Sequence, residues 1–316
     1  MKRTQKKSGR KWIFVAMVAV AAVVAAFAMS GGKVTEAVTQ AKDSPFNADR
    51  AGKDLATLVG FGPRPAASDA IAKARTYIID ELRKAGLEPK LDEFDATTPR
   101  GVKKMVNIRA IRPGAQPRVI ALTGHYDTKI FDFPFVGASD GGSSAAWVLE
   151  MARATNGLKL NNTLEFIFFD GEEAVLDWTD TDSVYGSRYD VDRRYRANEL
   201  KNLKALILVD MIGDKNLDIR KESGSTAWLT NTIWTTAGTM GFRREFPNDE
   251  ISVADDHVPY LKAGINAVDI IDFDYPYWHT AGDTLDKVSS ASLKIVGDVI
   301  YNALPEIDKR VSEMPN

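Results

Sequence analysis

The sequence predicts an α/β protein, in which a single domain carries a mixed, mostly parallel central sheet flanked by helices on both faces. Short, nearly all-apolar segments typical of buried strands alternate with segments of helical periodicity, and this alternation favours a sheet covered on two sides. A chain of 316 residues with 44% hydrophobic content is about right for one large domain, or at most two modest ones. We therefore expect one domain.

Five apolar segments are expected to form the strands of this sheet. They comprise residues 105–111, 118–123, 164–169, 205–209 and 267–271. The first two are joined through Arg112-Pro113-Gly114, which is typical of a hairpin turn. We therefore expect an antiparallel pair at one edge of the sheet.

Helices are expected around these strands. In residues 68–87 the apolar positions recur at helical spacing, and Gly86 closes the segment as glycine does at helix ends, so we expect a surface helix packed on the core. Similar patterns cover residues 143–154 and 226–239, and a further one, residues 289–303, follows the last strand.

The first 31 residues are expected to lie outside this fold. Six basic residues precede an uncharged apolar run at residues 12–29, whose length lies between that of a signal-peptide core and that of a short membrane span. The pattern predicts export to the periplasm or the extracytoplasmic face of a membrane, with residues 12–29 as a membrane anchor if they are not cleaved. We therefore expect residues 1–31 to form the export signal or anchor, residues 32–50 a linker, and residues 51–316 the main domain.

The composition excludes several kinds of chemistry. Lysine and arginine total 41 against 43 aspartates and glutamates, so there is no basic field to favour nucleic acid as a partner. The absence of cysteine excludes disulfides, cysteine-ligated zinc or iron–sulfur sites and a thiol nucleophile. Any chemistry that needs imidazole must use His125, His257 or His279.

Polar side chains cluster where the expected strands end. Ligands of open α/β sheets collect at the carboxyl ends of strands, because loops converge there. Carboxylates and imidazoles follow four of these ends: His125, Asp127, Asp140, Asp170, Glu172, Glu173, Asp210 and His279. The sequence therefore predicts a functional site at one edge of the sheet.

Asp140, Glu173 and His279 are the residues that we expect to bind a metal. Oxygen and nitrogen donors without sulfur suit a catalytic zinc ion whose fourth position stays open. Glu172, next to a ligand, is then the natural general acid/base. Each residue also has a structural interpretation: a Glu-Glu pair is often a solvated loop, and Asp140 could cap the helix expected at residues 143–154. Their coincidence at one sheet edge favours the site.

The remaining histidine, His257, lies in the segment Asp255-Asp256-His257-Val258-Pro259. A turn before Pro259 accounts for the histidine as well as a functional role does. Asp255 is the more informative residue of this segment, and the role of His257 stays open.

An ordered set of motifs resembles a known family. The motifs are Gly124-His125-Tyr126-Asp127-Thr128-Lys129, Asp140, Asp170-Gly171-Glu172-Glu173-Ala174 followed by Trp178 and Tyr185-Gly186-Ser187-Arg188, Val209-Asp210-Met211-Ile212-Gly213, Asp255-Asp256-His257-Val258-Pro259, and Trp278-His279-Thr280 with Asp283-Thr284. The set resembles the zinc aminopeptidase family of exported α/β peptidases. Several details resemble its glutaminyl cyclase branch, whose members convert N-terminal glutamine to pyroglutamate. The resemblance spans roughly residues 51–307.

The resemblance implies a glutaminyl-peptide cyclotransferase, an acyltransferase that cyclises the N-terminal glutamine of peptides or proteins and releases ammonia. It implies one Zn²⁺ held by Asp140, Glu173 and His279, with Glu172 moving the proton. Peptides or proteins with N-terminal glutamine are then the expected partners, and we expect a monomer.

The resemblance also implies the surroundings of the metal. Asp210 and Asp255 would form a hydrogen-bonded acidic pair beside it, sharing a proton because two packed carboxyl groups do not easily both ionise. Trp178 and Trp278 would wall a dry substrate pocket, which suits a reaction that consumes no water.

A two-metal aminopeptidase that hydrolyses N-terminal residues is the alternative. In it, His125 and Asp210 would complete a second zinc site bridged by Asp140, with Asp127 orienting His125. Every residue of that arrangement is present, so the ligands alone do not separate the two enzymes. The segments around Trp178, around Trp278 and at 255–257 resemble the cyclases. In one departure, Asp269, Asp272 and Asp274 stand in the strand region where animal cyclases tend to carry a histidine.

Overall fold

A six-stranded sheet is the centre of the fold in the computed structural model, which describes residues 43–315. Its strands, in spatial order, are β1 (Lys90–Thr98), β2 (Gly101–Arg112), β4 (Asn162–Phe169), β3 (Gln116–His125), β5 (Leu203–Asp210) and β8 (Asn266–Ile271). β2 pairs antiparallel with both of its neighbours, β1 and β4, whereas β4, β3, β5 and β8 run parallel. The predicted mixed, mostly parallel sheet with an antiparallel edge is confirmed.

The predicted hairpin between β2 and β3 is wrong, because β4 lies between these two strands. The linking segment crosses the start of β4 instead of folding back. A Cβ on Gly114 would lie 2.4 Å from the carbonyl oxygen of Asn162, and the Gln116 N–H donates to the Asn161 carbonyl at 2.7 Å. Gly114 is therefore needed for close approach to β4. The actual hairpin joins β1 to β2, where Thr98 pairs with Gly101.

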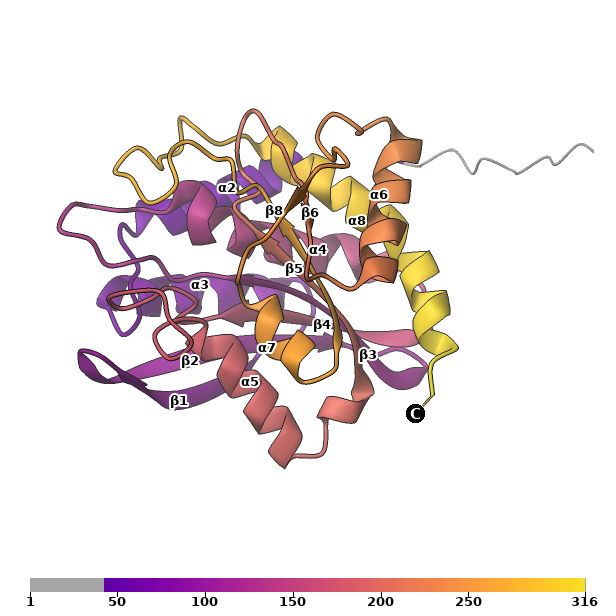
Figure 1. The fold of residues 1–316 in the computed structure, drawn as a ribbon, viewed down its shortest axis with the longest axis horizontal. Helices are drawn as coiled ribbons and strands as arrows, with labels where there is room; N and C mark the ends of the chain where they lie inside the picture. The colour runs from indigo at the N-terminus through magenta and orange to yellow at the C-terminus, as the bar shows by residue number, and fades with distance from the viewer. Residues whose placement is uncertain (1–42, 316) are drawn as a thin grey trace, which may run out of the picture. The chain divides into compact units, whose positions relative to one another are not determined.

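Helices cover both faces of the sheet (Figure 1). One face packs against α2 (Ala48–Gly60), α3 (Asp69–Lys84), α4 (Ser144–Ala154), α6 (Ala227–Met240) and α8 (Ser290–Ser312), and the other against α5 (Tyr185–Arg196) and α7 (His257–Lys262). The smaller elements are η1 (Ala138–Ser143), η2 (Thr155–Gly157), η3 (Leu200–Asn202), β6 (Lys221–Glu222) and β7 (Glu250–Ile251).

The four predicted helices are present as α3, α4, α6 and α8. α3 starts where expected because the Ser68 side chain accepts a hydrogen bond from the Ile71 N–H, which satisfies a free donor of the first turn. Just after its end, Gly86 takes a φ of +77°, a conformation that glycine adopts without strain.

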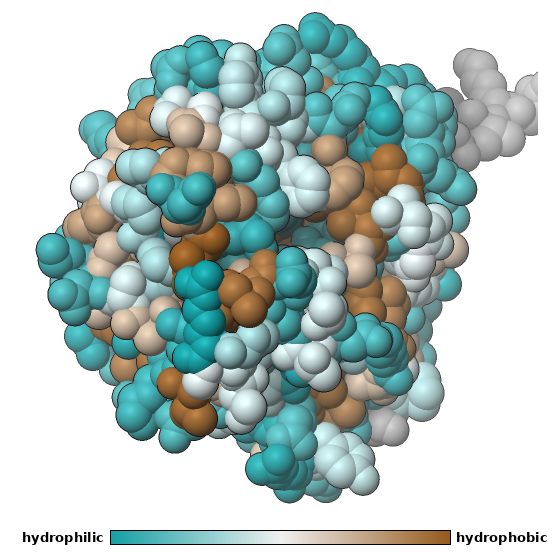
Figure 2. All heavy atoms as spheres, turned by 60° about the vertical axis from the view of Figure 1, so that its left-hand side comes forward, coloured by the Kyte–Doolittle hydropathy of each residue, from teal (hydrophilic) through white to brown (hydrophobic). Residues whose placement is uncertain are grey.

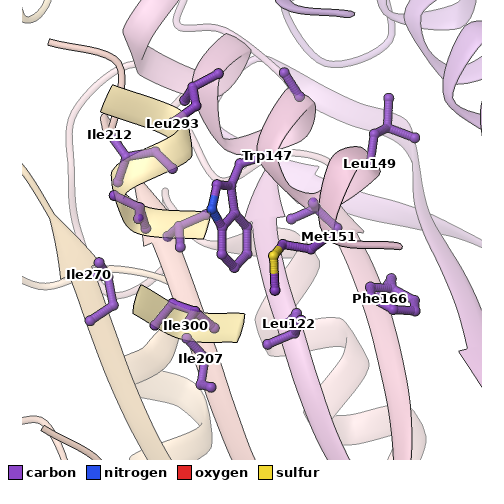
Figure 3. Close-up of a cluster of buried hydrophobic side chains, with 14 of the residues drawn as sticks. Leu122, Trp147, Leu149, Met151, Phe166, Ile207, Ile212, Ile270, Leu293 and Ile300 are labelled. Carbon is purple, nitrogen blue, oxygen red and sulfur yellow. The ribbon is translucent and has the colours of Figure 1, made fainter. Parts of the chain in front are cut away.

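The larger of the two core layers lies between the sheet and the five-helix face. Figure 3 shows Trp147 of α4 pointing between α8 and the sheet, close to Leu122, Ile207 and Ile300. All four side chains are fully buried. Because strand side chains alternate, neighbouring residues such as Leu206 face α5 and α7 instead. Both faces of β3 and β5 are thus apolar, which explains the unbroken apolar runs in the sequence.

The loops that follow the parallel strands all leave the sheet at one end, on the left of Figure 1. These loops carry the predicted site. The predicted export segment, residues 12–29, lies outside the described residues. Within residues 43–315, no helix combines the length and the apolar character that a membrane span requires.

Candidate metal centre and active site

The candidate site lies at the carboxyl ends of the parallel strands. His125 is the last residue of β3 and Asp210 the last of β5, while Asp140 lies in η1 and Glu172 and Glu173 follow β4. His279 comes from the loop between β8 and α8. The structure therefore brings together all of the residues predicted at this edge.

Asp140, Glu173 and His279 form one group of potential metal ligands. One ligand atom from each residue lies within 4.8 Å of the others. His279 Nε2 is 3.4 Å from Asp140 Oδ2 and 3.3 Å from Glu173 Oε1. Asp140 Oδ2 and Glu173 Oε2 are buried without a well-formed hydrogen bond from the described residues, and the cationic groups beside them are His279 Nε2 at 3.4 Å and Lys129 Nζ at 3.8 Å. Buried carboxylate oxygens without donors are costly, and a cation between them satisfies them.

The charges of this group are strongly coupled. Burial favours neutral His279, but Asp140 and Glu173 outweigh it and raise the pKa of the imidazole to about 9. Burial, together with the charge of Asp140, raises the pKa of Glu173 to about 7. For Asp140, the hydrogen bonds and charges of His125 and His279 overcome burial and hold its pKa below the usual range. A bound cation would take the place of the proton on His279, because ligation requires neutral imidazole.

Two buried carboxylates accept hydrogen bonds from the backbone N–H groups of two of these ligands and of the residues that precede them. Asp283 accepts the N–H groups of Ser139 at 2.8 Å and Asp140 at 3.1 Å. Asp127 accepts those of Glu172 at 3.1 Å and Glu173 at 3.2 Å. We call Asp127 and Asp283 the framing carboxylates. From the sequence, Asp127 was expected only to orient His125 in the two-metal alternative, and its Oδ1 lies 3.4 Å from His125 Nδ1. Asp283 was quoted within a motif. The action of both carboxylates through backbone N–H groups could not be read from residue type.

The side chain of Arg64 forms hydrogen bonds to several of the loops around the site. Its fully buried guanidinium donates to the carbonyls of Tyr126, Val136 and Gly137, and also to two carbonyls at the end of α2. Burial lowers its pKa to about 10, against the opposing charges of nearby aspartates. Arg64 was not predicted from the sequence, because a buried arginine that binds carbonyls leaves no periodic pattern.

His125 belongs to a second group with Asp140 and Asp210. Its Nε2 lies 3.0 Å from Asp210 Oδ1 and 3.3 Å from Asp140 Oδ1. Burial favours the neutral ring, but Asp210 and its neighbours raise the pKa of His125 well above the ordinary value. Asp210 Oδ1 also accepts hydrogen bonds from the Met211 N–H and the Ser144 hydroxyl. A protonated His125 thus satisfies the atoms that a second metal would use.

A cavity of about 430 Å³ opens beside the first ligand group. Trp178, Trp278 and Phe273 line it and remain 42%, 39% and 38% exposed. The Trp278 ring stacks on His279 with centroids 4.4 Å apart, and Phe273 lies 4.7 Å from Trp278. Figure 2 brings this side of the molecule forward and shows hydrophobic residues beside a hollow near its centre. Both tryptophans were predicted from the sequence to line a pocket, whereas Phe273 was not.

Glu172 and Asp255 also line the cavity. Burial raises the pKa of Glu172 well above its ordinary value, and the charges of Glu173 and Asp255 add to this effect against that of His125. Burial, followed by the charge of Asp210, raises the pKa of Asp255 to about 7. Two carboxyl groups that face the cavity can therefore hold protons near neutral pH.

Two site residues adopt backbone conformations that are rare outside glycine. His279 has a φ of +53° and Met211, which lines the cavity after Asp210, a φ of +49°. Such conformations cost about 1–3 kcal/mol each and persist only where the surroundings impose them. Two phenylalanines surround the His279 ring edge-to-face, Phe131 at 5.4 Å and Phe135 at 5.9 Å. Neither phenylalanine was predicted from the sequence to belong to the site.

His257 lies apart from the ligand groups. It is buried, with Nε2 3.2 Å from Glu222 Oε2 and Nδ1 3.6 Å from Asp269 Oδ2. It does not line the cavity. These contacts explain the acidic residue in β8 noted in the sequence, since Asp269 faces His257.

The mixed sheet, with two carboxylates and a histidine converging at the carboxyl ends of its strands, defines the class: an α/β protein of the zinc aminopeptidase type. Comparison with known protein families supports this class. The family model described as Peptidase family M28 matches residues 107–304. The chain belongs to this family.

Within the family, this chain is similar to proteins named as glutaminyl cyclases or as glutaminyl-peptide cyclotransferase-like proteins. A glutaminyl-peptide cyclotransferase-like protein of Bos taurus is 30% identical over 67% of this chain and 63% of its own length, so the chain spans less than two thirds of that relative. The crystal structure of an Acidobacteriales bacterium glutaminyl cyclase superposes with a TM-score of 0.80 at 36% identity, covering 86% of this chain and 98% of that one. The predicted resemblance is confirmed.

Two structural neighbours are named as an exopeptidase and as an aminopeptidase precursor. A Zn-dependent exopeptidase from Parabacteroides distasonis superposes with a TM-score of 0.77 at 27% identity, covering 84% of this chain and 99% of that one. The fold is thus shared by proteins named for cyclisation and for peptide hydrolysis. With the carboxylate and histidine groups of this chain, the Zn-dependent exopeptidase supports zinc as the metal.

Proposed function

We propose that this protein is a zinc-dependent glutaminyl-peptide cyclotransferase, which converts the N-terminal glutamine of peptides or proteins to pyroglutamate and releases ammonia. One observation carries the proposal: a three-residue metal group opens onto a cavity walled by Trp178, Trp278 and Phe273. Relatives named glutaminyl cyclases support it. Cyclisation consumes no water, so aromatic walls that exclude water suit the reaction.

Asp140, Glu173 and His279 would hold one zinc ion. Two carboxylates and one histidine without sulfur are a donor set that zinc accepts in catalytic sites with an open position. Two buried oxygens of this set have no well-formed hydrogen bond from the described residues, so they fit a cation. Bound there, zinc supplies Lewis-acid polarisation of the substrate's side-chain amide carbonyl.

Glu172 moves the proton. Its side chain lines the cavity, and its backbone N–H is fixed by Asp127. Burial raises the pKa of its carboxyl group well above the ordinary value, which suits a group that must both take up a proton and give it back. It accepts a proton from the α-amine as that nitrogen bonds to the amide carbon. It then returns the proton to the departing nitrogen, which leaves as ammonia.

Asp255 and Asp210 support Glu172 as an acidic pair. Asp210 is tied to His125 at 3.0 Å, and its charge contributes to the raised pKa of Asp255, about 7. No hydrogen bond joins the two carboxyl groups among the described residues, and Asp255 Oδ2 is buried without a partner, so the hydrogen-bonded pair expected from the resemblance is not observed. A proton on Asp255 keeps the cavity wall from accumulating negative charge near Glu172.

A di-zinc aminopeptidase is the second candidate, favoured by the group His125, Asp140 and Asp210. Against a second metal stand the hydrogen bonds that Asp210 Oδ1 accepts from two groups that are not ligands, the Met211 N–H and the Ser144 hydroxyl. Metal analysis separates the candidates: one zinc per chain supports the cyclase, and two support the peptidase.

The decisive assay compares two substrates with purified protein from about residue 44 onward. We expect ammonia release from a peptide with N-terminal glutamine, inhibition by imidazoles, and no hydrolysis of a leucine anilide. Glu172→Gln should retain zinc and lose activity by a factor on the order of 10² or more. Asp132→Asn, at an exposed loop position, is the matched control. Hydrolysis of the anilide without cyclisation would overturn the proposal in favour of the peptidase.

We further propose that the protein acts as a monomer after export, on the periplasmic or extracytoplasmic side of a membrane. The basic segment followed by the apolar run at residues 12–29 supports export and, without cleavage, anchoring. Cell fractionation with N-terminal sequencing of the mature chain tests both points. Light scattering of the soluble part tests the monomer.

A further inference from the structure

A second cavity, of about 460 Å³, lies next to the metal-bearing one. Its floor is apolar, formed by Val184, Val191, Val258 and Pro259. These residues come from α5, α7 and the segments just before them, and the two helices pack against each other below the sheet edge (Figure 1).

The two cavities share a wall. Trp178, Ala254 and Asp255 line both of them. Trp178 and Ala254 are exposed, so chain can pass over them from one cavity to the other. When the N-terminal glutamine of a peptide lies at the metal, its backbone carbonyl is bonded to the next residue of the peptide. The adjoining cavity is therefore within reach of the residues that follow.

The second cavity contains the positively charged side chain of Arg188, whose orientation is fixed by its contacts. Arg188 donates from Nε to the Ser183 carbonyl and from Nη2 to the Thr181 carbonyl, both at 3.1 Å, and lies 4.9 Å over the Tyr185 ring. Among the residues that the structure describes, no carboxylate forms an ion pair with it. Its Nη1 is likewise free of hydrogen bonds within that part of the chain.

Three other ionisable side chains line this cavity. Lys262 Nζ lies 3.8 Å from Asp180 Oδ1, and these side chains are 69% and 96% exposed. Asp255 lies on the wall shared with the first cavity, where burial and the charge of Asp210 raise its pKa to about 7. Arg188 thus has no carboxylate partner of its own among the described residues. A preorganised guanidinium without a carboxylate favours an anionic ligand, because its orientation has already been fixed.

We propose that the second cavity is a subsite for the peptide segment that follows the N-terminal glutamine, and that Arg188 selects an acidic side chain in that segment. The apolar floor contacts the aliphatic part of the side chain and of its neighbours. The inference rests on the proposed cyclase function. It adds a preference among glutamine peptides, which the metal-bearing cavity does not supply.

The experiment measures kcat/KM for ammonia release from peptides Gln-Gly-Gly-Gly-Gly-amide in which a single glutamate or lysine replaces glycine at positions two to five. We expect a glutamate-to-lysine ratio of about five or more at one or two of these positions, as for a partly exposed ion pair. Arg188→Gln should bring that ratio close to one, and Arg188→Glu should invert it.

Two further variants make the outcome unambiguous. Arg196→Gln, on the same helix but 76% exposed and paired with Asp192, should leave the ratio as in the wild type. Val191→Glu places a negative charge on the cavity floor without touching the contacts of Arg188, and should lower the ratio as well. A merely structural role of Arg188 would change the rates of all peptides alike and leave the ratio unmoved.

Equal turnover of all the glutamine peptides by the wild type, or an unchanged ratio in Arg188→Gln and Val191→Glu, refutes the subsite alone. An enzyme that releases ammonia from none of them refutes the proposed function and the subsite together.

Discussion

Replacing Asp283 by asparagine tests whether a residue outside the ligand set governs metal affinity. The carboxylate accepts the N–H groups of Ser139 and Asp140 and the Tyr275 hydroxyl at 2.8 Å. An amide of the same shape turns an NH₂ group toward one of these donors and leaves a buried N–H unpaired, at a cost of about 1–3 kcal/mol. If this cost falls on the position of Asp140, zinc binds about 5- to 150-fold more weakly.

Zinc affinity is measured by competition with a chelator of known affinity, and thermal unfolding is followed separately in excess chelator. Tyr275→Phe is the matched control, because it removes one donor to Asp283 and keeps both backbone hydrogen bonds. We expect it to lose fivefold at most, as for about 1 kcal/mol. Wild-type affinity in Asp283→Asn, or equal losses in the two variants, would refute the reasoning.

Three other predictions concern metal binding, loop geometry and acid stability. His279→Ala should lose zinc while His257→Ala retains it, as measured by elemental analysis. Gly141→Ala should destabilise the fold by at least about 1–2 kcal/mol in denaturant unfolding, because φ is +82° and the added Cβ would lie 2.4 Å from the Asp127 carbonyl oxygen. Burial opposes ionisation of Glu222, yet hydrogen bonds from His257 and the Gly224 N–H lower its pKa to about 2. The folded-state pKa lies below the unfolded one, so this contribution is present above about pH 4.5 and is lost as the pH falls toward 2. Glu222→Gln should flatten the stability profile in that window, and an unchanged profile would contradict the assignment.

The parallel core of the fold was predictable and its edge was not. Strands such as β5 are buried on both faces, so they appear in the sequence as unbroken apolar runs. β1 is an edge strand whose side chains are mostly exposed, and its polar sequence carries no such run. α5 was missed for a related reason: its buried face includes Asp190 and Arg194, which pair with each other and, through Arg194, with Glu165. Charges satisfied in pairs hide a helix from an apolar pattern.

The site divides in the same way. Residues whose proposed roles use their own side chains, such as Glu172 and His279, were predicted from residue type and position at strand ends. Residues that act through the backbone of others, such as Asp283 and Arg64, could not be, since their role depends on which N–H or carbonyl lies opposite. Phe273 was equally hidden, because an aromatic residue near the end of a strand is ordinarily part of the core.

The framing carboxylates make the scaffold of the site independent of its ligands. Asp127 accepts hydrogen bonds from the backbone N–H groups of Glu173 and of the residue before it, and Asp283 does the same for Asp140. Neither set of hydrogen bonds depends on the side chain that the donating residue carries. Exchanging Asp140 or Glu173 therefore leaves both loops where they are. Such a frame can be refitted with different donors, which makes this sheet edge a suitable starting point for engineering other metals into the same fold.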